Sequence, residues 1–352
     1  MVPKRLGQIA WVFIGGVFCI PVSGQAAWLH TIDPYAIKLV EDGPIRWYGL
    51  SYLLGFVIAY LLIRRVVVAG VSTLGKQQVG DLVITVAIGI VLGGRLGYLV
   101  FYQPNLLWTV GDSFPYWDAL ALNQGGMASH GGMLGGLVGC VIYARRHGHS
   151  SWYLADLVVF GTPLGLFLGR LANFVNGELY GRPCDPQYLF AVRFPQEIEN
   201  WSLQQLEAVY PAMPNPGKLI AAIQRGSADV IAAVEPHLTT RHPSQLYQAL
   251  MEGLLLFLLL SVVWYKPRKP GVLFAWFCIG YALLRILGER FRMPDAHIGY
   301  QWLELTRGQW LCVPLLLGGI LIWIGLQMRR ANPMGSWRRQ PTPTASDIPL
   351  AS

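Results

Sequence analysis

Charged side chains are scarce in this sequence. Asp, Glu, Lys and Arg together make up 13% of its 352 residues, whereas hydrophobic residues make up 53%. A soluble globular domain carries about 25% charged residues. So few charges cannot cover the surface of an ordinary soluble protein, and the composition therefore predicts a membrane protein.

Motifs for cofactors are absent as well. The chain has no Walker A motif, no GxGxxG after a predicted strand, no HExxH and no GxSG, so we expect neither a nucleotide nor a metal cofactor. The five cysteines show no CxxC or Cys/His ligand spacing, and three of the last four lie in or beside apolar runs, which predicts small core residues. They are Cys19, Cys140, Cys184, Cys278 and Cys312.

Long apolar runs dominate the rest of the chain. A helix needs about 20 mostly apolar residues to cross the hydrocarbon core of a bilayer. Seven stretches fit this requirement: 47–63, 81–101, 131–144, 152–168, 245–265, 271–287 and 309–327. We therefore expect an all-α polytopic membrane protein with about seven transmembrane helices in 28–330, a small external head region at 182–241 and a disordered cytoplasmic tail at 331–352.

The first 27 residues allow two interpretations. Lys4 and Arg5 precede the apolar run 9–22, and the small residues near 24–26 suit a signal peptidase, which predicts a cleaved signal peptide. The alternative is an uncleaved extra helix whose basic end lies in the cytoplasm. Both interpretations place Trp28 outside the cell membrane.

The distribution of basic residues supports this orientation. The external loop 103–129 contains no Lys or Arg, and the predicted cytoplasmic loops contain many. This matches the positive-inside rule, so the net charge of +8 sets the orientation of the chain and does not indicate nucleic acid as a partner. The cytoplasmic basic residues are Arg64, Arg65, Lys76, Arg145, Arg146, Lys266, Arg268, Lys269, Arg329, Arg330, Arg338 and Arg339.

The positive-inside rule does not explain a second group of arginines, because its members lie in or near the outer halves of predicted helices. They are Arg95, Arg170, Arg285, Arg290 and Arg292. A charge at membrane depth is costly, so such side chains usually face a partner or a polar cavity. Structural ion pairs between helices are one interpretation of these arginines, and a ligand site is the other.

The segment YALLRILGERFRMPDA, 281–296, favours a ligand site. Arg285, Glu289 and Arg292 are spaced i, i+4 and i+7, which on a helix forms one polar stripe. A guanidinium held by a carboxylate suits a phosphate, because its planar fork donates two parallel hydrogen bonds. Arg170, at the outer end of the fourth run, offers a second fork. Together they predict a site for a lipid phosphate at headgroup depth.

Other polar residues complete this predicted site. Asn173 can hydrogen-bond hydroxyl groups, although an asparagine at a helix end is also a common turn residue. Gly181 allows a ligand to approach the backbone closely. His130 begins a glycine-rich predicted helix and is either a general base or a helix cap. Tyr48 either binds a headgroup or belongs to the interfacial aromatic belt.

Five motifs resemble the prolipoprotein diacylglyceryl transferase family: GGRLGYLVFY at 93–102, HGGMLGG at 130–136, GRLANFVNGELYGRP at 169–183, RHPSQLYQA at 241–249 and RFRMPDAHIG at 290–299. They occur in order along nearly the whole chain after residue 44. The resemblance implies a bacterial inner-membrane enzyme that needs no cofactor. It would transfer the diacylglyceryl group of phosphatidylglycerol to the lipobox cysteine of a prolipoprotein, forming a thioether and releasing glycerol 1-phosphate.

The resemblance also implies roles for single residues. Arg170 and Arg285 match the essential arginines, His130 and Tyr48 match a functionally important histidine and tyrosine, and Glu289 is expected to orient an arginine. The expected lipid-binding residues are Tyr48, Arg170, Asn173, Glu178, Gly181, Arg285, Glu289 and Arg292.

Two positions depart from the family pattern. Ala172 stands where the signature commonly has glycine, and Gln248 stands where the family often has glutamate, which puts in doubt a role for a carboxylate at that position. The alternative function is not enzymatic: the chain would be a non-catalytic phospholipid transporter or scramblase. Such a protein would form no covalent product, and the lack of an internal repeat offers only weak evidence against it.

The histidine interpretations differ in a measurable way. If His130 is the general base, we expect His130→Asn to retain lipid binding and lose transfer, with partial recovery at alkaline pH because more of the acceptor thiol is then ionised. Transfer and lipid binding measured between pH 6 and 9 test this. Lost binding without recovery at high pH would instead support a structural histidine.

Overall fold

The structure is a computed structural model that describes residues 27–37, 45–69, 71–110, 115–121, 126–294, 301, 303 and 305–338. Residues 1–26 of the predicted signal peptide or extra helix (1–27), and residues 339–352 of the predicted tail, lie outside the described residues.

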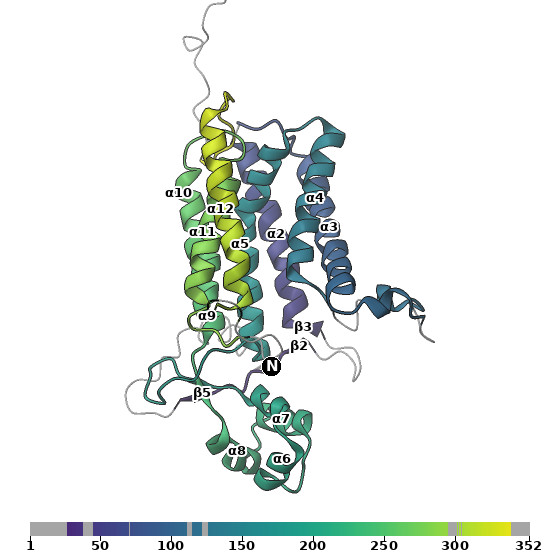
Figure 1. The fold of residues 1–352 in the computed structure, drawn as a ribbon, viewed down its shortest axis with the longest axis vertical. Coiled ribbons are helices and arrows are strands. Elements are labelled where there is room, and N and C mark those ends of the chain that lie inside the picture. The colour runs from purple at the N-terminus through teal and green to yellow at the C-terminus, as the bar shows by residue number, and fades with distance from the viewer. Residues whose placement is uncertain are drawn as a thin grey trace, which may run out of the picture. The chain divides into compact units, whose positions relative to one another are not determined.

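Helices make up 66% of the structure. The long ones are α2 (Trp47–Val68), α3 (Gln78–Phe101), α4 (Ser129–His147), α5 (Ser151–Asn176), α11 (Val272–Gly288) and α12 (Arg307–Met328) (Figure 1). A further helix, Ser244–Val263, is built from α9 (Ser244–Gln248), the π-helix η6 (Ala249–Leu255) and α10 (Leu256–Val263). Each of the seven predicted runs therefore coincides with a helix.

Within the described part of the chain, five helices are long and apolar enough to cross a bilayer: α2, α3, α5, Ser244–Val263 and α12. Helix α11 is apolar but has only 17 residues. Helix α4 is glycine-rich and carries Arg145, Arg146 and His147 in its last turn. The chain is thus a mostly helical, polytopic membrane protein.

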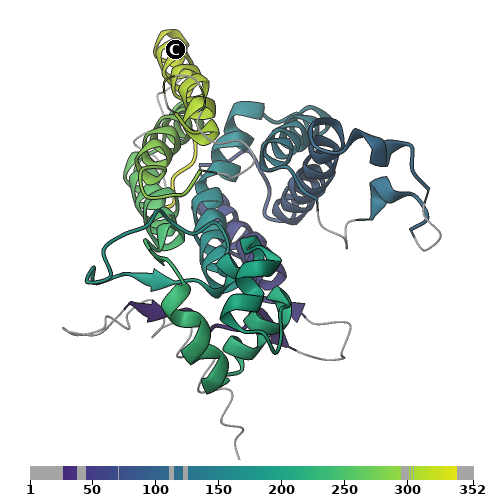
Figure 2. The same ribbon diagram turned by 60° about the horizontal axis from the view of Figure 1, so that its bottom comes forward.

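The chain divides into two compact units. The first comprises the described residues of Met1–Leu53, Leu166–Leu255 and Ala282–Val313, and the second those of Leu54–Gly165, Leu256–Tyr281 and Pro314–Ser352. In the second unit, α3 and α4 lie side by side (Figures 1 and 2). Their backbones meet at glycines: a Cβ added to Gly135 would collide with the carbonyl oxygen of Gly89 and lie 2.9 Å from the Cα of Gly93. Small residues of this kind let membrane helices pack closely.

Arg95 of α3 is one of the arginines that the positive-inside rule does not explain. In the second unit it holds a loop in place. Its guanidinium donates to the carbonyl oxygens of Ala119 at 2.7 Å, Asp118 at 2.6 Å and Gly126 at 3.2 Å. The arginine therefore fixes the segment after α3, which contains the 3-10 helices η1 (Pro104–Leu107) and η2 (Asp118–Leu120). Three backbone carbonyls thus bind this buried guanidinium.

The start of the predicted tail is ordered, in contrast to our expectation. Met334 pairs with Arg268, its carbonyl oxygen accepts from the indole of Trp264 at 3.2 Å, and Ser336 is buried. Residues 331–338 therefore pack on the second unit, because their aromatic and backbone contacts outweigh the polar composition that suggested disorder. The cysteine prediction is confirmed for Cys140, Cys278 and Cys312, which are buried free thiols.

The first unit contains short strands that the all-α prediction missed. Strand β1 (Trp28–Leu29) runs parallel to β4 (Val192–Arg193), which runs antiparallel to β5 (Thr240–Arg241). Strand β2 (Tyr35–Ile37) pairs antiparallel with β3 (Ile45–Arg46). Strands of two or three residues are too short to show the alternating pattern from which strands are predicted.

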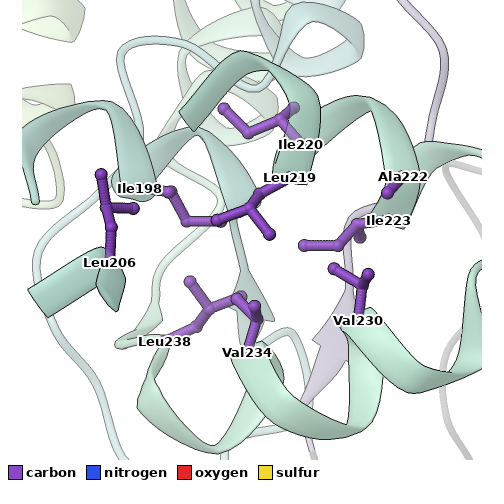
Figure 3. Close-up of a cluster of buried hydrophobic side chains, with 9 residues drawn as sticks. All are labelled: Ile198, Leu206, Leu219, Ile220, Ala222, Ile223, Val230, Val234 and Leu238. Atoms are coloured by element: carbon purple, nitrogen blue, oxygen red, sulfur yellow. The ribbon is translucent and has the colours of Figure 1, made fainter. Parts of the chain in front are cut away.

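Residues 195–238 of the first unit build an apolar core of their own (Figure 3). It lies among η4 (Pro195–Asn200), α6 (Leu203–Val209), α7 (Pro216–Gln224), α8 (Ala228–Val234) and η5 (Glu235–His237). A capping box between Ser202 and Gln205 begins α6, and the side chain of Asn215 caps α7. The buried side chains are Ile198, Leu206, Leu219, Ile220, Ala222, Ile223, Val230, Val234 and Leu238.

The glycine contact between α3 and α4 yields a prediction with a matched control in the same helix. We expect Gly135→Ala to lower the stability of the protein by about 1–3 kcal/mol, because the two backbones must separate. Gly132→Ala should be neutral or slightly stabilising, since a Cβ there would lie 3.5 Å from the nearest atom and alanine favours helix. Thermal unfolding in detergent measures both. Equal melting temperatures for the two variants would contradict this packing.

Candidate functional site

The signature segment begins at the end of α5, where a Schellman motif ends the helix. Gly177 has the positive φ of +69° that this motif requires, and the N–H of Glu178 donates to the carbonyl oxygen of Asn173 at 3.1 Å. The amide of Asn173 in turn donates to the Glu178 carboxylate at 2.7 Å. These two predicted site residues therefore bind each other, and they fix the turn that follows Arg170.

A buried histidine also holds the end of α5. His30 lies after β1, and its Nε2 is 2.7 Å from the carbonyl oxygen of Phe174. Burial lowers the pKa of His30 to about 4, so the ring is neutral at pH 7 and donates this hydrogen bond. The uncharged ring packs edge-on against Phe174.

Position 181 requires glycine, because the backbones of His242 and Phe291 lie too close to it to leave room for a Cβ. Its N–H donates to the carbonyl oxygen of His242 at 3.0 Å, and it forms an antiparallel bridge with Arg292. A Cβ at this position would collide with the His242 oxygen and lie 2.7 Å from the oxygen of Phe291. The neighbouring N–H of Arg182 donates to Phe291 at 2.9 Å. Gly181 therefore fixes the backbone of Arg292 against the signature segment.

The centre of the site is a carboxylate that the sequence analysis did not select. Glu252 of η6 is fully buried. Its Oε2 accepts from Arg170 Nη2 at 3.0 Å and Nε at 3.3 Å, and its Oε1 accepts from Arg285 Nη1 at 3.0 Å. One carboxylate thus holds the two predicted arginines together, each on its own oxygen.

A second carboxylate extends this network. Glu289 Oε1 pairs with Arg285 Nη2 at 2.7 Å and with Arg292 Nη1 at 3.2 Å, and its Oε2 accepts from the hydroxyl of Thr306 at 3.1 Å. The expectation that Glu289 pairs with an arginine is confirmed. The continuous helical stripe is wrong, because α11 ends at Gly288 and Arg292 lies in the bridge with Gly181. The turn still brings the three side chains together.

We call Arg170, Glu252, Arg285, Glu289 and Arg292 the arginine cluster. Its three guanidinium groups face two carboxylates, so the cluster keeps an excess of one positive charge. Arg170 uses Nε and Nη2 for Glu252, and its Nη1 makes no hydrogen bond within the described part of the chain. The cluster therefore presents a held guanidinium with one free edge, the arrangement that suits an anion with several oxygens.

Tyr48 and His130 are predicted site residues that are not members of the arginine cluster. Tyr48 accepts a hydrogen bond from the hydroxyl of Tyr52 at 3.2 Å, and the two rings are in edge-to-face contact. Within the described part of the chain, Tyr48 therefore makes no hydrogen bond to the arginine cluster. His130 is the second residue of α4, in the other unit, and the structure does not describe its side chain. Its role stays a prediction.

Sequence reasoning missed Glu252 and Thr306. A signal for Glu252 was present, because a single carboxylate in the apolar run 245–265 requires a partner at membrane depth. Thr306 had none, since its role depends on the fold: it precedes α12, where its hydroxyl accepts from the N–H of Gln309 and donates to Glu289.

The bridge through Glu252 is open to test. We expect Glu252→Gln to destabilise the protein by about 3–5 kcal/mol, because it leaves Arg170 without a counter-charge and Arg285 with Glu289 alone. Glu235→Gln is the control: it breaks a partly exposed pair with Arg193 at 2.9 Å, and such pairs contribute about 0–1 kcal/mol. Melting temperatures of both variants in detergent compare the pairs. An equal fall in melting temperature for both variants would mean that the buried bridge stabilises the protein no more than the partly exposed pair does.

Comparison with known proteins supports the resemblance. The family model of prolipoprotein diacylglyceryl transferase matches residues 34–325. A phosphatidylglycerol–prolipoprotein diacylglyceryl transferase of Bdellovibrio bacteriovorus is 43% identical, covering 88% of this chain and 97% of that protein. The proteins of the same name from Rhodospirillum centenum and Paracidovorax citrulli are 39% and 37% identical, covering 83% and 86% of this chain and 91% and 98% of their own lengths. The chain therefore belongs to the prolipoprotein diacylglyceryl transferase family.

Proposed function

We propose that this chain transfers the diacylglyceryl group of phosphatidylglycerol to the lipobox cysteine of a bacterial prolipoprotein, the first step of lipoprotein maturation. The cysteine sulfur forms a bond to the terminal glyceryl carbon of the lipid, and the bond between that carbon and the phosphate oxygen breaks. The products are a thioether and glycerol 1-phosphate, and the proton of the thiol is given up to a base. Family membership over most of the chain supports this reaction.

The observation that carries the proposal in the structure is the free edge of Arg170. Glu252 holds Arg170 and Arg285 side by side through opposite oxygens, so both guanidinium groups are oriented before a ligand arrives. The departing phosphate gains negative charge as the carbon–oxygen bond breaks. Fixed positive groups stabilise that charge without reorganisation, and the single positive excess of the arginine cluster matches a phosphodiester of one negative charge.

The attacking thiol also needs help. A free cysteine has a pKa of about 8.5, so only a few per cent is thiolate at pH 7. His130 is our proposed base, and the arginine cluster adds a field that favours the thiolate. Asn173 and Glu178 bind each other beside Arg170, and we propose that this pair and the Gly181 turn keep the signature segment in place around the lipid headgroup.

The site belongs in a bacterial inner membrane with a defined topology. We propose seven transmembrane helices, with α4 and α11 added to the five long apolar helices, and an external head at 182–241. The N-terminal end of the mature chain would lie outside and the C-terminal end in the cytoplasm, as the positive-inside rule predicts. The partners are then phosphatidylglycerol, the prolipoprotein signal peptide and the surrounding bilayer.

The arginine fork can be tested by a change that keeps its charge. We expect Arg170→Lys to lower transfer by about 100-fold or more, because lysine cannot bind Glu252 through two nitrogens and still present a free edge. The assay follows the thioether product from phosphatidylglycerol and a lipobox peptide. Arg193→Lys, in the partly exposed pair with Glu235, is the matched control and should transfer normally.

Two outcomes of this assay would count against the proposal. Near-normal transfer by Arg170→Lys would remove the fork from the mechanism. A wild-type protein that binds phosphatidylglycerol but forms no thioether would favour a lipid transporter or scramblase.

A further inference from the structure

Two glutamines beside the arginine cluster are buried with unpaired amide atoms. Gln248, the last residue of α9, is fully buried, and neither its Oε1 nor its Nε2 has a hydrogen-bond partner in the described part of the chain. Gln245, one turn earlier, is equally buried; its Nε2 donates to the carbonyl oxygen of Glu178 at 2.7 Å, and its Oε1 is unpaired. Buried polar groups normally have partners, so these three atoms require an explanation.

The position of the glutamines connects them to the site. Gln245, Gln248 and Glu252 are spaced i, i+3 and i+7 and so lie along one side of the helix. A Cβ placed on Gly288 would lie 3.3 Å from Gln248 Cγ and 3.7 Å from Glu252 Oε1, so these two side chains meet at the same point of α11. The glutamines therefore form a neutral polar strip from the signature segment to the arginine cluster.

Packing alone does not account for Gln248. A leucine or methionine of similar volume would fill the same space without leaving an amide unpaired. Both atoms of the Gln248 amide are unpaired, so turning the amide over changes nothing. A ligand that supplies the missing partners is the physical reason for a polar side chain at this position.

The unpaired atoms define the chemistry of that ligand. They are two acceptors and one donor, and a hydroxyl group can serve both kinds because it donates and accepts. A phosphate oxygen accepts only and would leave both Oε1 atoms unpaired. An ammonium group donates only and would leave the Nε2 donor of Gln248 without a partner. Adjacent hydroxyl groups on a neutral chain fit best.

We propose that Gln245 and Gln248 bind the hydroxyl groups of the lipid headgroup and so select a glycerol headgroup over others. The inference rests on the proposed function, because it places the phosphate of the same lipid on Arg170. It also agrees with the departure of Gln248 from the family pattern, since glutamine and glutamate both present an acceptor oxygen to a hydroxyl. The arginine cluster would hold the charge of the headgroup and the glutamines its hydroxyls.

A pair of lipids isolates the hydroxyl contribution. Phosphatidylglycerol and phosphatidylmethanol both carry one phosphodiester charge, and only the first has headgroup hydroxyls. The purified full-length protein in detergent is titrated with each lipid, and the rise in melting temperature reports binding. We expect the wild type to bind phosphatidylglycerol about five- to tenfold more tightly, the effect of one or two buried hydrogen bonds.

Gln248→Leu should abolish this preference by weakening phosphatidylglycerol binding alone. Its melting temperature without lipid should not fall, because the change removes an unpaired buried amide. Gln248→Glu keeps an acceptor oxygen and should keep part of the preference. Gln205→Leu is the control: it makes the same change at an amide whose hydrogen bonds lie in the capping box of α6, and it should leave the preference intact.

Each outcome decides the proposal. An unchanged preference in Gln248→Leu, or an equal loss of affinity for both lipids, would overturn it in favour of a structural glutamine. If Gln248→Leu does not fold, the loss of all preference in Gln248→Glu would overturn it equally. The transfer assay separates this inference from the proposed function, because lipid preference is measured without a peptide. A preference that depends on Gln248, with no thioether formed, would keep the hydroxyl subsite and reject the reaction.

Discussion

The bridge from Arg170 through Glu252 to Arg285 is the interaction on which the rest of the site depends. Glu252 is fully buried at its place in an apolar helix, so it stays charged only because two guanidinium groups replace water around it. Arg170 needs the carboxylate for the same reason, and Arg285 shares its charge between Glu252 and Glu289. Since α5, η6 and α11 each contribute one of the three charges, moving any of these elements would leave a buried charge without its partner.

The π-helix η6 supports this arrangement. A π-helix adds a residue per turn and is uncommon, and it often occurs at functional sites. Here it covers Ala249–Leu255 and includes Glu252, directly after the helix that carries Gln248. Gln248 and Glu252 are four residues apart, and both side chains lie near Gly288 of α11. Neutral and charged polar groups thus lie side by side at the surface of α11.

Backbone contacts place the outer part of the site. The bridge of Gly181 with Arg292 and the hydrogen bond from Gly181 to His242 join three segments that follow α5, β5 and α11. Glycine is required because a Cβ would collide with the His242 carbonyl. Arg292 therefore reaches Glu289 from a fixed backbone, and the cluster keeps one positive charge in excess. Main-chain hydrogen bonds thus fix where Arg292 lies, and the side chains of the cluster set its net charge.

The sequence by itself determined the class of the protein and most of the residues of the site. Hydropathy located the helices, a charge in an apolar run marked Arg170 and Arg285, and five ordered motifs identified the family, because these signals are local. Only the tertiary structure decided the pairings. Glu252 lies 82 residues from Arg170 and 33 from Arg285, and no local pattern connects residues so far apart. The strand pairing of β1 with β4 and the packed start of the tail also depend on contacts with distant segments, which is why hydropathy and spacing did not predict them.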